Sequence, residues 1–183
     1  MKTHLIEEQD LIHALQQDPN NGSFAILLDK YQKPLYWHIR GIVKNHEDAD
    51  DVLQNVFIKV YKSIKNFKED SKLYTWLYRI ATNESLTFLK KRARHLQISN
   101  EELQTRIVEN LESDVYFNGD DIQLALEKAI AQLPEKQQLV FQMKYHQDMK
   151  YEDMSEILGT SVGALKSSYH IATKKVTAIL QAD

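Results

Sequence analysis

The chain has 183 residues, 43% of them hydrophobic and 27% charged, which allows one packed domain or two small ones. Five glycines and three prolines are too few for a sheet protein with many tight turns, and the lack of cysteine excludes disulfides, thiolate zinc sites and cysteine nucleophiles. The sequence contains no run of 18 apolar residues and no basic region followed by an apolar stretch near Met1, so we expect a cytoplasmic protein without membrane insertion or signal peptide.

The net charge of −3 is distributed unevenly. Residues 1–95 carry 15 Lys and Arg against 12 Asp and Glu, residues 96–122 carry one basic residue against seven acids, and residues 123–183 carry seven of each. Affinity for nucleic acid rises with the number of phosphates neutralised, so this chain alone is expected to bind DNA weakly. If the protein works on DNA, another component must help to hold it there.

In the first 95 residues, apolar periodicity predicts a series of helices. A weaker helix is predicted over Leu5–Leu15, and a second over Phe24–Val43, which Pro34 is expected to kink or interrupt. The clearest stripe predicts a helix over Asp50–Lys65. Ser71 is then expected to cap a helix that ends in a basic tail at residues 90–94.

Residues 96–122 are acidic and have poor periodicity, which predicts a mostly flexible linker. Beyond it, amphipathic helices are predicted over Ile122–Leu133 and from Pro134 to His146. The overall expectation is an all-α fold with two small helical domains, residues 1–95 and 123–183, joined by a flexible acidic linker.

The end of the chain has the pattern of a helix-turn-helix. A short helix over Tyr151–Leu158 is followed by Gly159 as its C′ residue, and Ser161 is placed to cap a longer last helix. A helix pair in an ordinary bundle would give a similar pattern, but the surface predicted for the last helix favours a nucleic-acid groove. Small, basic and hydroxyl side chains share the side opposite its apolar stripe: Gly163, Ala164, Lys166, Ser167, His170 and Lys174.

Two segments resemble a known family. The run Asp48-Ala-Asp-Asp-Val-Leu-Gln-Asn-Val-Phe, with Asn66-Phe67 and Thr75-Trp-Leu-Tyr-Arg-Ile-Ala-Thr-Asn83, is similar to region 2 of bacterial extracytoplasmic-function (ECF) sigma factors of the sigma-70 family. The runs from Leu133 to Phe141 and from Tyr151 to His170 resemble their region 4. The resemblance implies a factor that binds core RNA polymerase, directs it to promoters through the −35 and −10 elements, and assists DNA melting.

The resemblance assigns roles to residues of the first domain. Asp51 and Gln54, an outward i, i+3 pair, match the family's polymerase contact, whereas Asp48 is explained equally well as a capping carboxylate. The loop from Asn66 to Lys72 matches a site that captures a flipped −10 base. The residues implied at the −10 element are Asn66, Phe67, Lys68, Tyr78, Arg79, Asn83, Lys90, Lys91 and Arg92, the last three alternatively being a solvated helix end.

For the −35 element the resemblance implies the last helix. The residues expected there are Ser161, Gly163, Ala164, Lys166, Ser167, His170 and Lys174. Many relatives carry arginine where Ser168 and Ile171 stand, and residues 123–183 contain no arginine. Because arginine is the commonest reader of guanine, the surface here is expected to depend more on backbone contacts and DNA shape.

Two other classes of protein were weighed. A stand-alone helix-turn-helix regulator would need a ligand or dimerisation domain in front, where residues 24–94 carry the region 2 pattern instead. A helical enzyme or adaptor is disfavoured because the seven histidines form no nucleophile–base or metal-ligand group and no phosphate-binding glycine loop is present. We therefore expect no catalysis by this chain, no metal and no cofactor. Core RNA polymerase, promoter DNA and an anti-sigma factor are the partners that the resemblance implies.

Overall fold

The computed structural model describes residues 7–111 and 121–182, and every regular element in these ranges is a helix. The predicted all-α fold is therefore confirmed. In chain order the elements are α1 (Glu8–Gln17), α2 (Ser23–Val43), α3 (His46–Ser63), the short η1 (Ile64–Asn66), α4 (Leu73–Leu96), α5 (Asn100–Asn110), α6 (Asp121–Ala131), α7 (Glu135–Phe141), the π-helical η4 (Gln142–His146), α8 (Tyr151–Leu158) and α9 (Val162–Ala182).

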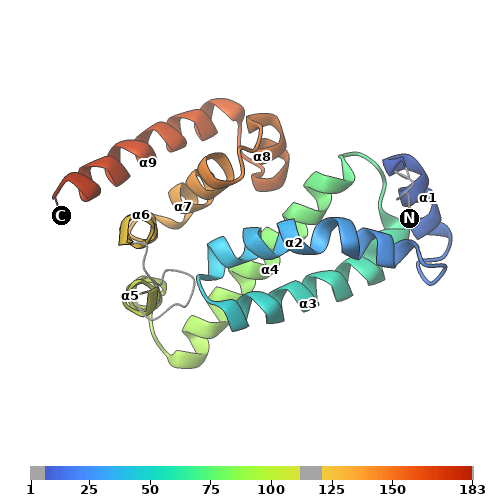
Figure 1. The fold of residues 1–183 in the computed structure, drawn as a ribbon, viewed down its shortest axis with the longest axis horizontal. Coiled ribbons are helices and arrows are strands. Elements are labelled where there is room, and N and C mark those ends of the chain that lie inside the picture. Colours follow the sequence, from blue (N-terminus) through green and yellow to red (C-terminus); the bar gives the residue numbers. More distant parts are fainter. Residues whose placement is uncertain (1–6, 112–120, 183) are drawn as a thin grey trace.

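Three long helices, α2, α3 and α4, form the first block, and α1 closes one end of it (Figure 1). The stripe predicted for α3 is buried, with Val52, Val56 and Val60 each at most 2% exposed. The helix starts earlier than predicted because Asn45 caps it: its side-chain oxygen accepts a 2.9 Å hydrogen bond from the backbone N–H of Asp48.

Two local predictions for this block were wrong. The predicted interruption at Pro34 is absent, because α2 continues past it. The proline lies on the exposed side, where the carbonyl group that loses its helical partner can face water. Ser71 does not cap α4, because the helix begins two residues later and Lys72 occupies the N-cap position without a side-chain hydrogen bond.

The second block contains the helix-turn-helix. Gly159 ends α8 in the left-handed region with φ of +63°, a conformation that glycine adopts without strain. The hydroxyl oxygen of Ser161 then accepts a hydrogen bond of 3.3 Å from the N–H of Ala164 in the first turn of α9. The predicted roles of Gly159 at the end of one helix and of Ser161 as the cap of the next are confirmed.

Within the segment predicted as a mostly flexible linker, residues 100–110 form the helix α5. Ser99 and Glu102 make a capping box: each side chain accepts a hydrogen bond from the other residue's backbone N–H, at 3.0 and 2.8 Å. Leu103, Ile107 and Leu111 are buried at a spacing of four residues. Residues 112–120 of the predicted linker lie outside the described ranges.

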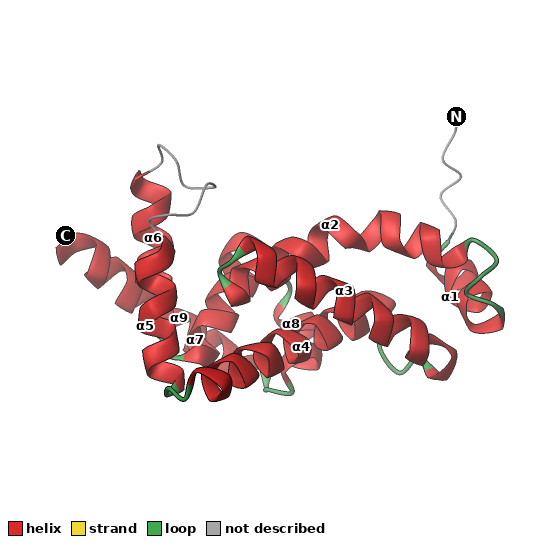
Figure 2. Ribbon diagram, turned by 90° about the horizontal axis from the view of Figure 1, so that it is seen from below, coloured by secondary structure: helices red, strands yellow, loops and turns green. Residues whose placement is uncertain are grey.

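The two blocks are in contact. α8 lies beside α4 in both views (Figures 1 and 2), and the apolar core of the first block continues into Met143, Met154 and Ile157 of the second. A smaller cluster around Ile130, Phe141 and Ala172 holds α6, α7 and α9 together. The sequence predicted the two blocks but not this shared core.

Candidate nucleic-acid and polymerase interface

Asp51 and Gln54 lie on the exposed side of α3, as predicted. Gln54 lines a groove of about 520 Å³ between α2 and α3, whose floor includes Phe24, Leu53 and Phe57. Ile58, 47% exposed, and Tyr61 add apolar surface to the same groove. An exposed apolar groove edged by polar side chains is the usual chemistry of a protein-binding surface.

Asp48 does not share this exposed face. Its carboxylate forms an ion pair with the guanidinium of Arg92, so the start of α3 is fastened to the last turns of α4. Burial raises the pKa of Asp48, and the neighbouring Arg92 opposes that rise. The structure thus joins a predicted polymerase contact to a predicted DNA contact, and both side chains hold the first block together.

Of the residues predicted to bind DNA at the loop before α4, one is buried and two are exposed. Phe67 is buried, with its ring centroid 5.0 Å from that of Trp76, so it belongs to the core rather than to an open base pocket. The side-chain amide of Gln16 on α1 donates a 2.8 Å hydrogen bond to the Phe67 carbonyl oxygen, which anchors the loop. Asn66 and Lys68 remain exposed beside it.

On α4, Tyr78 packs against α2, whereas Arg79 contacts the second block. Tyr78 is only 4% exposed, and its ring packs against Tyr74 and against His38 of α2. Arg79 donates hydrogen bonds to the backbone carbonyl oxygen of Glu156 in α8. Further along α4, Asn83, Lys90 and Lys91 are exposed.

The predicted face of α9 is open to solvent. The exposed residues are Ser161, Gly163, Ala164, Lys166, Ser167, His170 and Lys174. A side chain at Gly163 would meet nothing within 4 Å, so this end of the helix has room for a close approach. The Lys166 ammonium lies 5.7 Å from the centroid of the Tyr151 ring, which holds the lysine at the entrance of the helix.

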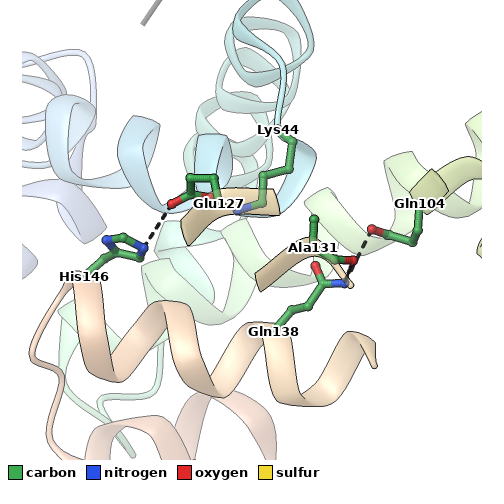
Figure 3. A network of polar contacts seen from close by, with 6 residues as sticks. All are labelled: Lys44, Gln104, Glu127, Ala131, Gln138 and His146. Atoms are coloured by element: carbon green, nitrogen blue, oxygen red, sulfur yellow. Dashed lines mark hydrogen bonds and ion pairs between the residues drawn. The ribbon is translucent and has the colours of Figure 1, made fainter. Parts of the chain in front are cut away.

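A buried polar network between the blocks was missed by the sequence reasoning (Figure 3). The Lys44 ammonium, on the residue that ends α2, lies 2.5 Å from a carboxylate oxygen of Glu127 in α6, and His146 contacts the other oxygen at 3.1 Å. Burial raises the pKa of Glu127, but the adjacent Lys44 and His146 overcome this and lower it to about 2.

Gln138 extends this network toward α5. Its side-chain amide donates hydrogen bonds to the carbonyl oxygens of Ala131 and Leu133, at 3.1 and 2.7 Å, and approaches Gln104 at 3.4 Å (Figure 3). The contacts of Gln138 with Gln104 and of Lys44 with Glu127 join residues far apart in the chain, and periodicity carries no signal for them. In the sequence, the only hint of this network is Lys44, at the end of the predicted helix over Phe24–Val43.

Neither a metal centre nor a membrane span was found where the chain is described. Over residues 7–111 and 121–182, no three His, Asp or Glu side chains are grouped so that they could hold an ion. No helix in these ranges has the length and apolarity needed to cross a bilayer.

Comparison with known proteins gives two family matches in the order predicted. The Sigma-70 region 2 model matches residues 27–95, and the Sigma-70, region 4 model matches residues 123–176. Together they span more than half of the chain.

Individual relatives agree with this. The RNA polymerase sigma-H factor of Pseudomonas aeruginosa is 29% identical over 183 residues, covering 96% of this chain and 94% of that protein. The ECF RNA polymerase sigma-E factor of Haemophilus influenzae is 30% identical over 172 residues, covering 88% and 89%. Among solved structures, the sigma factor RpoE of Bartonella quintana, in complex with the anti-sigma factor NepR, superposes with a TM-score of 0.67 at 22% identity, covering 88% of this chain and 99% of that one.

Proposed function

Because the chain belongs to the ECF sigma factors of the sigma-70 family, and thus directs RNA polymerase to promoters at the start of transcription, we propose how its surfaces divide that work. Residues 1–95 form the domain for core polymerase and the −10 element, residues 96–122 connect, and residues 123–183 form the domain for the −35 element. Sigma factors are non-catalytic initiation factors, and we assign no reaction to this chain either.

The −35 assignment rests on the open face of α9. Its first turn offers Gly163 and Ala164, which permit close approach to base edges, next to Lys166 and Ser167, which can donate hydrogen bonds to them. Lys174, two turns further along, is placed for a phosphate. This row of small and polar side chains on the second helix of a helix-turn-helix is the observation that carries the proposal.

Core polymerase is proposed to bind the groove between α2 and α3. Gln54 lines it, Asp51 is exposed beside it, and Ile58 and Tyr61 supply apolar contact area. Asp48 supports this surface indirectly, since its pair with Arg92 fixes the start of α3.

The −10 strand is proposed to follow α4 and its preceding loop. Asn66 and Lys68 are exposed at the loop, and Asn83 and Lys90 further along. Between them Tyr78 is buried and Arg79 is hydrogen-bonded to α8. Aromatic and cationic side chains along one helix suit stacked bases and a phosphate backbone.

An anti-sigma factor is a further proposed partner, because the Bartonella quintana relative in the comparison is bound to one. The binding of polymerase and promoter DNA would place the protein in the bacterial cytoplasm. A stand-alone regulator is not favoured, since region 2 of a sigma factor precedes the helix-turn-helix.

A gel shift tests the proposal. Duplex promoter fragments are mixed with the chain alone, with purified core polymerase alone, and with both. We expect a salt-resistant, sequence-specific complex only when both proteins are present. A specific complex formed by the chain alone would favour the stand-alone regulator and would overturn this division of the work.

A further inference from the structure

We propose that Tyr151, the first residue of α8, is a positioning residue for the −35 surface, where its ring orients Lys166 toward the bases and Lys144 toward the DNA backbone. The inference rests on the proposed role of α9 at the −35 element. It adds two residues that lie outside α9 and were not predicted for this surface.

The Tyr151 ring is the common neighbour of two cations. The ammonium of Lys144, in η4, lies 5.5 Å from the centroid of the ring, and that of Lys166, in α9, lies 5.7 Å from it. A lysine ammonium within about 6 Å of the centroid is attracted by the negative face of an aromatic ring. Three elements of the second block therefore meet at one side chain.

Tyr151 is anchored in the protein core. It is partly buried and packs against the apolar cluster, and Met154 and Ile157, further along α8, are at most 5% exposed. Lysine, by contrast, has a long and mobile side chain that loses much rotamer freedom when it is bound. A fixed ring that restrains the ammonium in advance lowers this cost at the moment of binding.

An aromatic ring orients a lysine without neutralising it. Over residues 7–111 and 121–182, Lys166 makes no ion pair, and the contact of its ammonium is with the Tyr151 ring. A carboxylate in the place of the ring would compete with guanine and phosphate oxygens for the same ammonium. The ring leaves the positive charge available to DNA, and the direction in which it holds the ammonium affects which base edge is reached.

Lys144 has a charged partner as well as the ring. Its ammonium donates to a carboxylate oxygen of Asp148 at 2.7 Å and to the carbonyl oxygen of Met149 at 3.3 Å. The Asp148 side chain is 92% exposed, and exposed ion pairs are weak and screened by salt. A DNA phosphate can therefore replace this carboxylate at little cost.

The two lysines are close enough to act on one stretch of DNA. Because both ammonium groups lie near the same ring centroid, their separation is no more than the two distances to it together. Phosphates on one strand of B-DNA follow one another every 3.4 Å or so, roughly, along the helix axis. The pair thus spans only a few nucleotides, which allows a base contact by Lys166 and a neighbouring backbone contact by Lys144.

Two substitutions separate the ring from its packing. Tyr151→Phe keeps an aromatic face for both lysines, whereas Tyr151→Leu keeps an apolar side chain and removes that face. Binding of the chain with core polymerase to promoter fragments randomised in the −35 element, at two salt concentrations, measures affinity and sequence preference. Urea unfolding of the free variants measures their stability.

We expect Tyr151→Phe to bind as the wild type does. Tyr151→Leu should weaken promoter binding about two- to fivefold, as expected for exposed cation–π pairs, and relax preference at the positions that Lys166→Ala relaxes. In a chain that already carries Lys166→Ala, Tyr151→Leu should relax preference no further, because the two residues act as a unit.

Lys144→Ala should lower the salt slope by about one and leave sequence preference unchanged, as for a phosphate contact. Lys136→Ala, which removes an exposed lysine of α7 outside this cluster, is the matched control. An unchanged slope after Lys144→Ala, or an equal fall after both substitutions, would overturn the role of Lys144.

Two results would overturn the role of Tyr151. Equal losses with Tyr151→Phe and Tyr151→Leu would assign the effect to the hydroxyl group rather than to the ring. A loss with Tyr151→Leu that is uniform across sequences and accompanied by lower stability would mean that the tyrosine only packs.

Proton NMR of the free chain separates this inference from the −35 assignment. The ε-methylene protons of Lys166 should be shifted upfield by the ring, relative to those of Lys175, and should lose this shift in Tyr151→Leu. Absence of the shift would overturn the orientation of Lys166 by Tyr151. A shift that is present, together with unchanged preference after Lys166→Ala, would instead overturn the −35 role of α9.

Discussion

Arg79 on α4 donates two hydrogen bonds, of 3.0 and 2.7 Å, to the backbone carbonyl oxygen of Glu156 on α8. The two residues belong to different sigma regions, so the bonds tie the proposed strand-binding helix to the first helix of the helix-turn-helix. A side chain inferred to bind DNA thus has a protein acceptor in the free chain.

The polymerase surface is tested by Asp51→Ala together with Gln54→Ala. Both side chains are exposed, so the fold should be unchanged, whereas affinity for core polymerase should fall about tenfold or more if they are central contacts. Titration of labelled chain with core polymerase measures this. The control is Glu47→Ala, an exposed carboxylate of the same helix outside the groove; an equal loss there would show that only the general charge of α3 matters.

Lys166 and Lys174 should differ in what they contribute to −35 binding. Lys166→Ala should cost roughly 1–3 kcal/mol and relax preference at one or two promoter positions, because the side chain is placed at the base edges. Lys174→Ala should weaken binding about equally on all sequences and lower the salt slope by about one, as expected for a phosphate contact.

Holoenzyme binding to promoters randomised in the −35 element, at two salt concentrations, separates these effects. The exposed neighbour Lys175 provides the control substitution Lys175→Ala. Unchanged affinity and preference after Lys166→Ala would mean that a different face of α9 enters the groove.

His38 makes the free energy of unfolding of the chain depend on pH. Burial lowers its pKa from 6.5 to about 4, although a hydrogen bond from the ring to the side-chain oxygen of Gln147 opposes this, and its other ring nitrogen contacts the Thr82 hydroxyl. Below pH 6.5 the unfolded chain takes up a proton that the folded chain refuses until about pH 4. The free energy of unfolding should therefore fall by about 3 kcal/mol across this window.

Urea unfolding at pH 7.5 and pH 5 measures the effect, and about 2 kcal/mol of it should be lost between these two pH values. His38→Gln should lose this component of the pH dependence, whereas His13→Gln, at an exposed position, should retain it. An identical pH dependence in wild type and His38→Gln would contradict the assignment.

The capping box predicts the stability of α5. Ser99→Ala removes the hydroxyl that accepts the N–H of Glu102 and should cost about 0.5–2 kcal/mol of local stability. Amide hydrogen exchange measures this: the substitution should speed exchange in residues 101–107 relative to the wild type and leave exchange in α3 unchanged. Exchange unchanged by Ser99→Ala would mean that packing alone forms the helix.

The helices were largely predictable because their apolar stripes and end residues are local signals. Gly159 and Ser161 bounded the helix-turn-helix correctly, and the α3 stripe is buried as its spacing indicated. The helix α5 was missed because apolar residues are few in an acidic segment, although Ser99 and Glu102 were readable as a capping box.

The site was predictable only in part. Exposure of Asp51, Gln54 and the α9 row follows from helical period alone. Burial of Phe67 and Tyr78, the pair of Asp48 with Arg92, and the contact of Arg79 with α8 depend on which elements meet in space. Periodicity describes one element at a time and carries no such information.

Transcription in vitro with purified core polymerase on a library of promoter fragments tests the central claim most directly. Core polymerase with this chain should produce transcripts from a limited set of fragments that share −35 and −10 sequences, and Asp51→Ala with Gln54→Ala should reduce them. The same transcripts from core polymerase alone, or none with the chain added to active core enzyme of its own bacterium, would contradict the account.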